Sequence, residues 1–128
     1  MFENATGAAV VAAADLDRAR SFYEGVLGLQ PDAEFPPNEE AVFYRLGGVP
    51  LMVYRTSYAG TAQNTVFAID TDDLDRDMAA LRAKGIEFLE YDFPGLKTVD
   101  GVAELEGEKS AWFADSEGNI LALGQRNR

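Results

Sequence analysis

Histidine and cysteine, which serve many enzymes as bases, nucleophiles and metal ligands, are both absent from this sequence. Their absence excludes disulfides, thiolate nucleophiles, thiolate metal sites and a Ser-His-Asp triad. General acid or base catalysis would therefore depend on Asp, Glu, Tyr or Lys side chains with displaced pKa values. The sequence also contains no evident glycine loop of the kind that holds phosphate groups.

Aromatic and thioether side chains are the remaining candidates for contact with a ligand. Alternation along a predicted strand places Met52 and Tyr54 on the face that would line a cleft, with the residues between them facing the helices. Tyr44 and Trp112 are further candidates for the same side. Their rings could stack on a planar or glycosidic ligand, which the hydroxyl and indole N–H would orient. The alternative interpretation is that these aromatics fill the core or a dimer interface.

Three charged or loop features allow two interpretations each. Arg45 and Arg55 could clamp a carboxylate, but arginines on strands more often lie solvated on an outer face. The segment 91–98 mixes turn residues with two aromatics and a lysine, which suits a loop that folds over a ligand. An ordered surface excursion is the alternative for that segment.

The elements that must position these residues begin with a short apolar run, Gly7 to Ala14, which predicts a buried strand. Asp15 suits the N-cap of a helix, and the apolar residues after it recur at helical spacing until Gly28, which suits a C-terminal stop. Two further strands are predicted over Ala41 to Leu46 and Pro50 to Thr56.

The second half repeats this order after a polar linker, Ser57 to Asn64. Its predicted elements are a strand at Thr65 to Asp70, a helix at Asp73 to Lys84 that stops at Gly85, a strand at Ile86 to Tyr91, and a hairpin of Ala111 to Asp115 with Asn119 to Gln125. The two helix starts share the sequence Asp-Leu-Asp-Arg, at 15–18 and 73–76, and Ala41 to Arg55 aligns without a gap with Ala111 to Gln125. We interpret the chain as a duplication.

Two stretches carry a specific family resemblance. Residues 15–29, Asp-Leu-Asp-Arg-Ala-Arg-Ser-Phe-Tyr-Glu-Gly-Val-Leu-Gly-Leu, and residues 111–121, Ala-Trp-Phe-Ala-Asp-Ser-Glu-Gly-Asn-Ile-Leu, resemble the two signatures of the glyoxalase, bleomycin-resistance and extradiol-dioxygenase (vicinal oxygen chelate) superfamily. The resemblance implies an α+β fold of two tandem βαβββ modules, about 5–57 and 63–126, whose curved sheets form an open cleft. It also implies a single domain and a homodimer.

Metal-dependent members of that superfamily place ligands at four strand positions. Carried over to this chain, these positions are Ala8, Met52, Val66 or Asn64, and Ala122. Alanine and valine have no donor atom, a thioether is a poor ligand for a hard divalent ion, and a single amide oxygen does not make a site. The resemblance is therefore expected to extend to the fold without the metal, and no cofactor is expected. Asn64 and Ala122 remain candidates for contact with a ligand.

Composition limits the partners. The chain has 128 residues, enough for one domain, with 47% hydrophobic residues and a formal charge of −11. Nucleic acid and anionic membrane surfaces would be repelled. No apolar run reaches the length of a membrane span, and the first residues lack the pattern of a signal peptide, so we expect a cytoplasmic protein.

Three functions remain from different classes. We favour a metal-independent protein that binds a small organic or antibiotic-like molecule in the cleft between the modules, where the acidic balance would favour a cationic guest. The second is a metal-independent isomerase or lyase acting on a small carbonyl compound, which would need a cleft-facing Asp or Glu with a raised pKa near Tyr or Arg. The third is a metal-dependent glyoxalase I or dioxygenase, for which the side chains that would bind the metal are missing.

Overall fold

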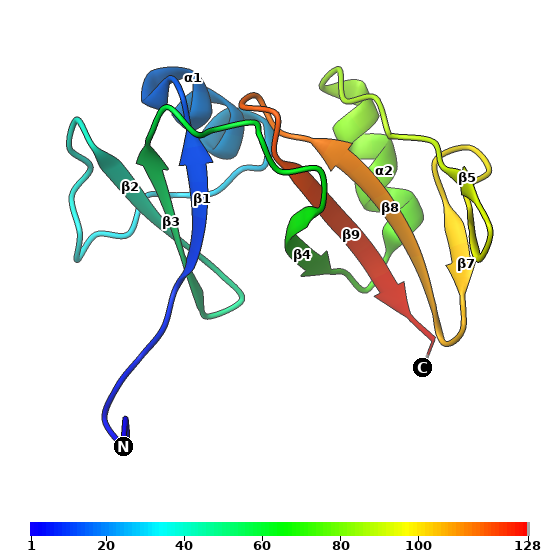
Figure 1. The fold of residues 1–128 in the computed structure, drawn as a ribbon, viewed down its shortest axis with the longest axis horizontal. Coiled ribbons are helices and arrows are strands. Elements are labelled where there is room, and N and C mark those ends of the chain that lie inside the picture. Colours follow the sequence, from blue (N-terminus) through cyan, green and yellow to red (C-terminus); the bar gives the residue numbers. More distant parts are fainter. Residues whose placement is uncertain (128) are drawn as a thin grey trace.

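The computed structural model describes residues 1–127 and shows two sheets lying side by side, in a mixed α+β arrangement that confirms the predicted fold class (Figure 1). The first half contains β1 (Ala9–Ala13), α1 (Leu16–Arg20), the π-helical segment η1 (Ser21–Val26), β2 (Ala41–Leu46) and β3 (Val49–Arg55). The second contains β4 (Thr65–Asp70), α2 (Leu74–Ala83), β5 (Asp92–Phe93), β6 (Leu96–Lys97), β7 (Ala103–Leu105), β8 (Glu108–Ala114) and β9 (Ile120–Arg126). The two main sheets have the orders β1-β3-β2 and β4-β9-β8-β7, and β5 and β6 form a small separate sheet.

Both helices begin as the sequence predicts. The Asp15 carboxylate accepts a hydrogen bond from the Arg18 backbone N–H at 3.1 Å, and Asp73 accepts one from the Arg76 N–H at 3.0 Å. Each bond satisfies one of the N–H groups that a helix start leaves without a partner. The shared Asp-Leu-Asp-Arg sequence is therefore a capping signal in both halves.

The first helix widens before it ends, which its apolar spacing did not reveal. After α1 the chain continues as the π-helical segment η1, and the Leu27 N–H donates to the Phe22 carbonyl five residues earlier at 3.1 Å. The helix stops at Gly28, whose φ of 73° is one that residues with a side chain rarely adopt, as predicted.

The first sheet has a reduced fourth strand. Beyond β2, pairing is limited to a single bridge between Pro31 and Tyr44 and to the Asp32 N–H, which donates to the Phe43 carbonyl at 2.7 Å. Proline has no N–H to donate, so it cannot contribute to a continuing ladder. The first half is thus a βαββ unit with one extra bridge, whereas the second has four strands in its main sheet.

The strand predicted over Ile86 to Tyr91 is wrong. This segment forms only one bridge, between Phe88 and Phe113, and the rest of the same edge of β8 pairs with β7, where Ala103 faces Ser110. Two separate segments therefore share one edge of β8: β7 pairs with its first residues, and Phe88 bridges to it at one later position. The connection between 91 and 109 also contains the short β5–β6 hairpin.

One hydrophobic core lies between the helices and the covered faces of both sheets. Leu51 and Val53 from β3 and Phe113 and Leu121 from β8 and β9 belong to the same buried cluster. Within residues 1–127, no helix has the length and apolar character needed to cross a membrane.

The linker between the halves is packed against the second half. It crosses from β3 to β4 (Figure 1), and a Cβ atom added to Gly60 would lie 2.8 Å from the Glu117 carbonyl oxygen. Gly60 also has a φ of 76°. Its lack of a side chain is needed for both the backbone conformation and the close approach.

Gly60→Ala is predicted to destabilise the protein more than Gly107→Ala. Both glycines have φ near 80°, but a Cβ at Gly107 would meet no atom within 4 Å. Both variants should lose about 1–2 kcal/mol through the left-handed backbone, and Gly60→Ala should lose a further ~1–3 kcal/mol through the clash. Urea unfolding of the two variants and the parent protein measures the difference. Equal losses in the two variants would show that the linker is not packed as described.

Candidate functional site

The candidate site is the face of the two sheets that the helices leave uncovered, which we call the open face. In the first sheet Val10, Phe43 and Met52 lie side by side on it, since Met52 pairs with both of the others. In the second sheet Ala122 likewise pairs with Trp112. Their neighbours along the strands, such as Val11 and Leu51, are buried against the helices. Tyr54 follows Met52 on the open face and is 36% exposed. Contact of these two side chains with a ligand stays a prediction.

An aromatic pair stands at the equivalent place in each half. Phe43 contacts Phe35, from the turn before β2, with ring centroids 5.1 Å apart. Trp112 contacts Tyr91, from the connection before β5, with centroids 5.5 Å apart and an edge-to-face geometry. Both distances fall in the range of favourable aromatic pairs. The open face therefore has an aromatic wall in each sheet, built from a strand residue and a loop residue.

The assignment of Tyr44 to the ligand side is wrong. Tyr44 is fully buried on the covered face, stacks on Tyr23 with centroids 5.9 Å apart, and donates from its hydroxyl to Glu24 at 2.8 Å. Burial, together with the hydrogen bond to Glu24, raises the pKa of the Tyr44 hydroxyl above its ordinary value.

The cause of that error is a one-residue slip in the repeat alignment. Tyr44 pairs with Leu51, and Phe113 pairs with Leu121, the counterpart of Leu51. Tyr44 is therefore equivalent to Phe113, and Phe43 is equivalent to Trp112. The gapless alignment had matched Phe43 with Phe113, because the turns that join the paired strands differ in length. A shift of one residue moves a side chain to the other face of a sheet.

The four family ligand positions lack metal-binding chemistry. Met52 and Ala122 lie on the open face of their sheets, and Ala8 lies just before β1. Val66 sits at a register irregularity in β4, while Asn64 lies before that strand and donates from its amide nitrogen to the Thr65 carbonyl at 3.2 Å. The residues present do not fit a divalent metal at this place, because no carboxylate or imidazole is among them. Among residues 1–127, no group of three or more Asp and Glu side chains is arranged to hold a metal elsewhere.

A small pocket lies where the two halves meet near the end of β1. It has a volume of about 230 Å³, and Val10 and Tyr54 from the first half line it together with Val66 from the second. Tyr58 and Ala62 of the linker also contribute to the lining. The linker therefore forms part of the wall of the candidate site, which the sequence had not suggested.

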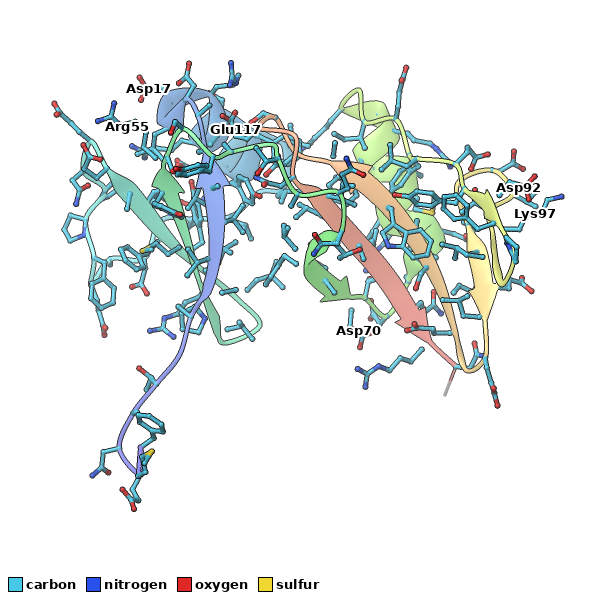
Figure 2. The ribbon with its side chains drawn as sticks, viewed as in Figure 1. Asp17, Arg55, Asp70, Asp92, Lys97 and Glu117 are labelled. Carbon is cyan, nitrogen blue, oxygen red and sulfur yellow. The ribbon has the colours of Figure 1, made fainter. Side chains whose placement is uncertain are left out.

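The strand arginines face the solvent in ion pairs. Arg45 donates to Asp32 at 2.9 Å and Arg55 to Glu40 at 2.7 Å, and both guanidinium groups are largely exposed. A larger but shallow depression of about 670 Å³ contains Arg55 and Asp17, at the outer edge of the first half (Figure 2). Its charges are mixed, and both of its arginines, Arg20 and Arg55, are already in ion pairs, which fits a solvated surface better than a carboxylate clamp.

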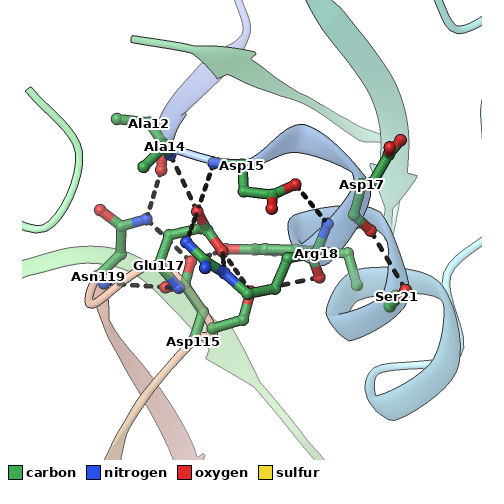
Figure 3. A network of polar contacts seen from close by, with 11 residues as sticks. Ala12, Ala14, Asp15, Asp17, Arg18, Ser21, Asp115, Glu117 and Asn119 are labelled. Carbon is green, nitrogen blue, oxygen red and sulfur yellow. Dashed lines mark hydrogen bonds and ion pairs between the residues drawn. The ribbon is translucent and has the colours of Figure 1, made fainter. Parts of the chain in front are cut away.

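A buried polar network fixes one half against the other (Figure 3). The Glu117 carboxylate accepts hydrogen bonds from the Ala14 and Asp15 backbone N–H groups, both at 2.9 Å, and from Arg18 at 2.7 and 3.0 Å. Ser116 donates a further one at 2.8 Å. The second half thus provides an acceptor for N–H groups at the point where β1 ends and α1 begins.

Tyr23 and Asn119 extend the network in both directions across the junction. The Tyr23 hydroxyl donates to the Asp115 carboxylate at 2.6 Å, and the Asn119 side-chain amide donates to the Ala12 carbonyl at 2.8 Å. Asp115 also accepts from the Asn119 backbone N–H at 2.9 Å, which closes the turn. From the sequence, residues 115–119 are predicted only as a hairpin turn. Two carboxylates and an amide within five residues are the signal that this turn forms hydrogen bonds with another part of the chain.

The electrostatics of this network explain how it tolerates burial. Burial alone would raise the pKa of the Glu117 carboxyl, but the hydrogen bonds from Arg18, Asp15 and Ser116 outweigh it and lower that pKa to about 2. Burial, the Asp115 charge and the hydrogen bond to it raise the pKa of the Tyr23 hydroxyl far above its ordinary range. Hydrogen bonds from arginine likewise lower the pKa values of the Glu24 and Asp77 carboxyls, from Arg20 and Arg76 respectively.

Comparison with known proteins agrees with the fold. The sequence profile of the Glyoxalase/Bleomycin resistance protein/Dioxygenase superfamily matches residues 6–123. A glyoxalase/bleomycin resistance protein/dioxygenase from Alicyclobacillus acidocaldarius has a similar structure, with a TM-score of 0.68 and 19% identity, covering 98% of this chain and 93% of the other. No curated protein matches the sequence significantly.

Two further similar structures belong to proteins with named ligands. TnmS3, an antibiotic binding protein from Streptomyces sp. CB03234, gives a TM-score of 0.60 at 18% identity, covering 97% of this chain and 98% of the other. A mutant of the fosfomycin resistance protein FosX from Listeria monocytogenes, complexed with Mn(II) and 1S,2S-dihydroxypropylphosphonic acid, gives 0.66 at 14% identity, covering 94% and 88%. At these identities the likeness concerns the fold alone.

Glu117→Gln is predicted to lower the stability at pH 7 by roughly 1.5–3 kcal/mol, since hydrogen bonds to a charged group are lost. The pKa of Glu117 is lower in the folded chain than its ordinary value of 4.5, so the carboxylate stabilises the fold above that pH. This contribution should disappear as the pH falls from 4.5 through about 2. Urea unfolding between pH 7 and 2 measures both effects.

Glu104→Gln, at an exposed position on β7, is the matched control and should change neither the stability nor its pH dependence. If Glu117→Gln behaved in the same way as this control, Glu117 would not hold the two halves together.

Proposed function

This chain belongs to the Glyoxalase/Bleomycin resistance protein/Dioxygenase superfamily, and we propose that it binds a small organic molecule on its open face without a metal ion. The observation that carries the proposal is the pair of aromatic walls, Phe35 with Phe43 and Tyr91 with Trp112, at equivalent places in the two halves. Between them the sheet positions carry Met52 and Ala122.

The surface between the walls favours apolar contacts over coordination. Met52 offers a flexible, polarisable side chain that adapts to irregular ligands, and Ala122 leaves space beside Trp112. Ring faces bind planar groups through stacking and burial of apolar area. The phenol of Tyr54, which is partly exposed and lines the pocket between the halves, adds a hydrogen-bonding group at one end.

The chemistry of the guest follows from the same residues. A molecule with an aromatic or otherwise flat apolar part would bury it against Phe43 or Trp112, and the formal charge of −11 favours a cationic substituent. TnmS3 is described as an antibiotic binding protein. An antibiotic-like compound held without being altered is the version of this function that we propose.

Ligand binding should change the emission of Trp112, which is the only tryptophan in the chain. Compounds from an antibiotic-like library are first selected by an increase in the melting temperature. Those that bind as proposed should also shift or quench the tryptophan fluorescence, which gives the Kd by titration. If the selected compounds all left the emission unchanged, binding would be elsewhere on the protein.

Phe43→Ala should raise the Kd of the same ligands about tenfold. The loss of one aromatic contact of ~1.4 kcal/mol corresponds to that factor. The variant keeps Trp112 as the reporter. Phe2→Ala removes a phenylalanine that is 78% exposed near the N-terminus and should leave the Kd unchanged. Equal affinities for the two variants would contradict the proposal.

Purified, untagged protein is expected to contain no stoichiometric zinc, nickel, iron or manganese, because the four family positions offer no adequate ligands. Elemental analysis after dialysis checks this expectation. A variant with Ala8→His, Met52→Glu, Val66→His and Ala122→Glu should gain a metal if these positions are assigned correctly. Tightly bound metal in the parent protein would overturn the assignment.

A further inference from the structure

A second pocket lies on the side of the sheets opposite the open face, where the end of η1 approaches α2. It has a volume of about 340 Å³, within the range of roughly 300–1,000 Å³ that small-molecule pockets occupy. Val26 and Leu46 line it from the first half, and Ile69, Leu81 and Leu123 line it from the second. We call this cavity the seam pocket, because both halves of the chain build it.

The wall of the seam pocket is suited to an apolar chain. Val26, Ile69 and Leu81 are partly buried and pack against the core, and Leu123 is 3% exposed and belongs to it. A ligand that covered the three partly buried residues would remove apolar surface from water in both halves at once, which is favourable. The same ligand would thus stabilise the docked arrangement of the halves.

The charged groups at the mouth leave one positive charge available. The Lys84 ammonium donates to the Gly25 carbonyl at 2.9 Å and to the Val26 carbonyl at 3.3 Å. An ammonium has three hydrogens, so one remains for a further acceptor. These carbonyls end the π-helical segment and hold the ammonium at the edge of the cavity.

The other charged residue in the lining is already matched. The Asp77 carboxylate accepts from Arg76 at 3.0 Å and from the Thr71 hydroxyl. The polar end of a ligand in the seam pocket would therefore meet the free donor of Lys84 rather than an unpaired carboxylate. Charge complementarity selects an anionic head group.

We propose that the seam pocket binds a small amphiphilic carboxylate, with its apolar chain between Leu81 and Leu123 and its carboxylate on the Lys84 ammonium. This inference is independent of the function proposed for the open face. It concerns a different surface, different residues and a ligand of opposite charge.

Octanoate, octanol and octylamine, used below their micelle concentrations, are probes with the same chain and different head groups. Calorimetric titration of the full chain should give octanoate a Kd about tenfold lower than that of octanol, the factor expected for one hydrogen bond to a charged group. Octylamine should bind more weakly still. Binding of octanoate should leave the Trp112 emission unchanged, which separates it from binding on the open face. Equal affinity for the three probes, or no binding of octanoate, would overturn the proposal.

Lys84→Met keeps the apolar stem and removes the charge, so octanoate should lose its advantage over octanol. The ratio of the two affinities is measured within one variant, so any loss of stability does not affect the conclusion. Lys97→Met, on the exposed hairpin strand β6, is the control and should keep the ratio of the parent protein. A preserved ratio in Lys84→Met would contradict the role of Lys84.

Ala80→Phe places a ring in the cavity, because Ala80 is part of its lining. It should abolish octanoate binding, whereas Ala79→Phe, at the neighbouring exposed position of α2, should not. Binding that survives Ala80→Phe, or that is lost equally in both variants, would place the ligand outside the seam pocket.

Discussion

The burial of one carboxylate ties the two halves of this chain together. The Glu117 side chain has no exposed area, and a charge in that position is tolerated only when hydrogen bonds replace the water it has lost. The second half supplies Glu117, but two of its donors are backbone N–H groups where β1 ends and the first helix begins, and the others include Arg18. If the halves separated, the carboxylate would gain water, but the helix start would lose an acceptor. The Tyr23 hydroxyl of the first half likewise donates to a carboxylate of the second half, that of Asp115.

This network sets the geometry of the candidate site because the sheets do not pair with each other. β1 and β4 are edge strands of separate sheets, each hydrogen-bonded on one side only. Their relative position is therefore determined by the shared core, by the turn at 115–119 and by the close contact of Gly60 with that turn. The pocket beside Tyr54 contains residues from both halves and from the linker, so its shape depends on all three contacts. A polar network fixes direction more strictly than apolar packing does, because hydrogen bonds require specific angles.

The sequence predicted those parts of the fold that local chemistry determines. Asp15 was predicted as a cap because a helix start needs an acceptor at a defined position. The repeat of its motif predicted a second helix from Asp73, and β4 was predicted with its observed limits. Tyr44 was assigned to the wrong side of its sheet, because its side depends on the strand register and the hairpin turn shifted that register relative to the repeat. The strand predicted over Ile86 to Tyr91 was wrong for another reason. Its apolar pattern resembles a strand, but whether it pairs depends on β7, which lies later in the chain.

The same register places apolar side chains, Met52 and Ala122, beside the aromatic rings of the open face. The family resemblance implies that metal-dependent members carry ligands at the positions of Met52 and Ala122, which here pair with Phe43 and Trp112. A carboxylate at either place without a cation would need water, which conflicts with an apolar surface. The Met52 thioether lies beside Phe43 and the Ala122 methyl group lies beside Trp112. In each half, this side chain therefore extends the apolar surface of the neighbouring aromatic ring.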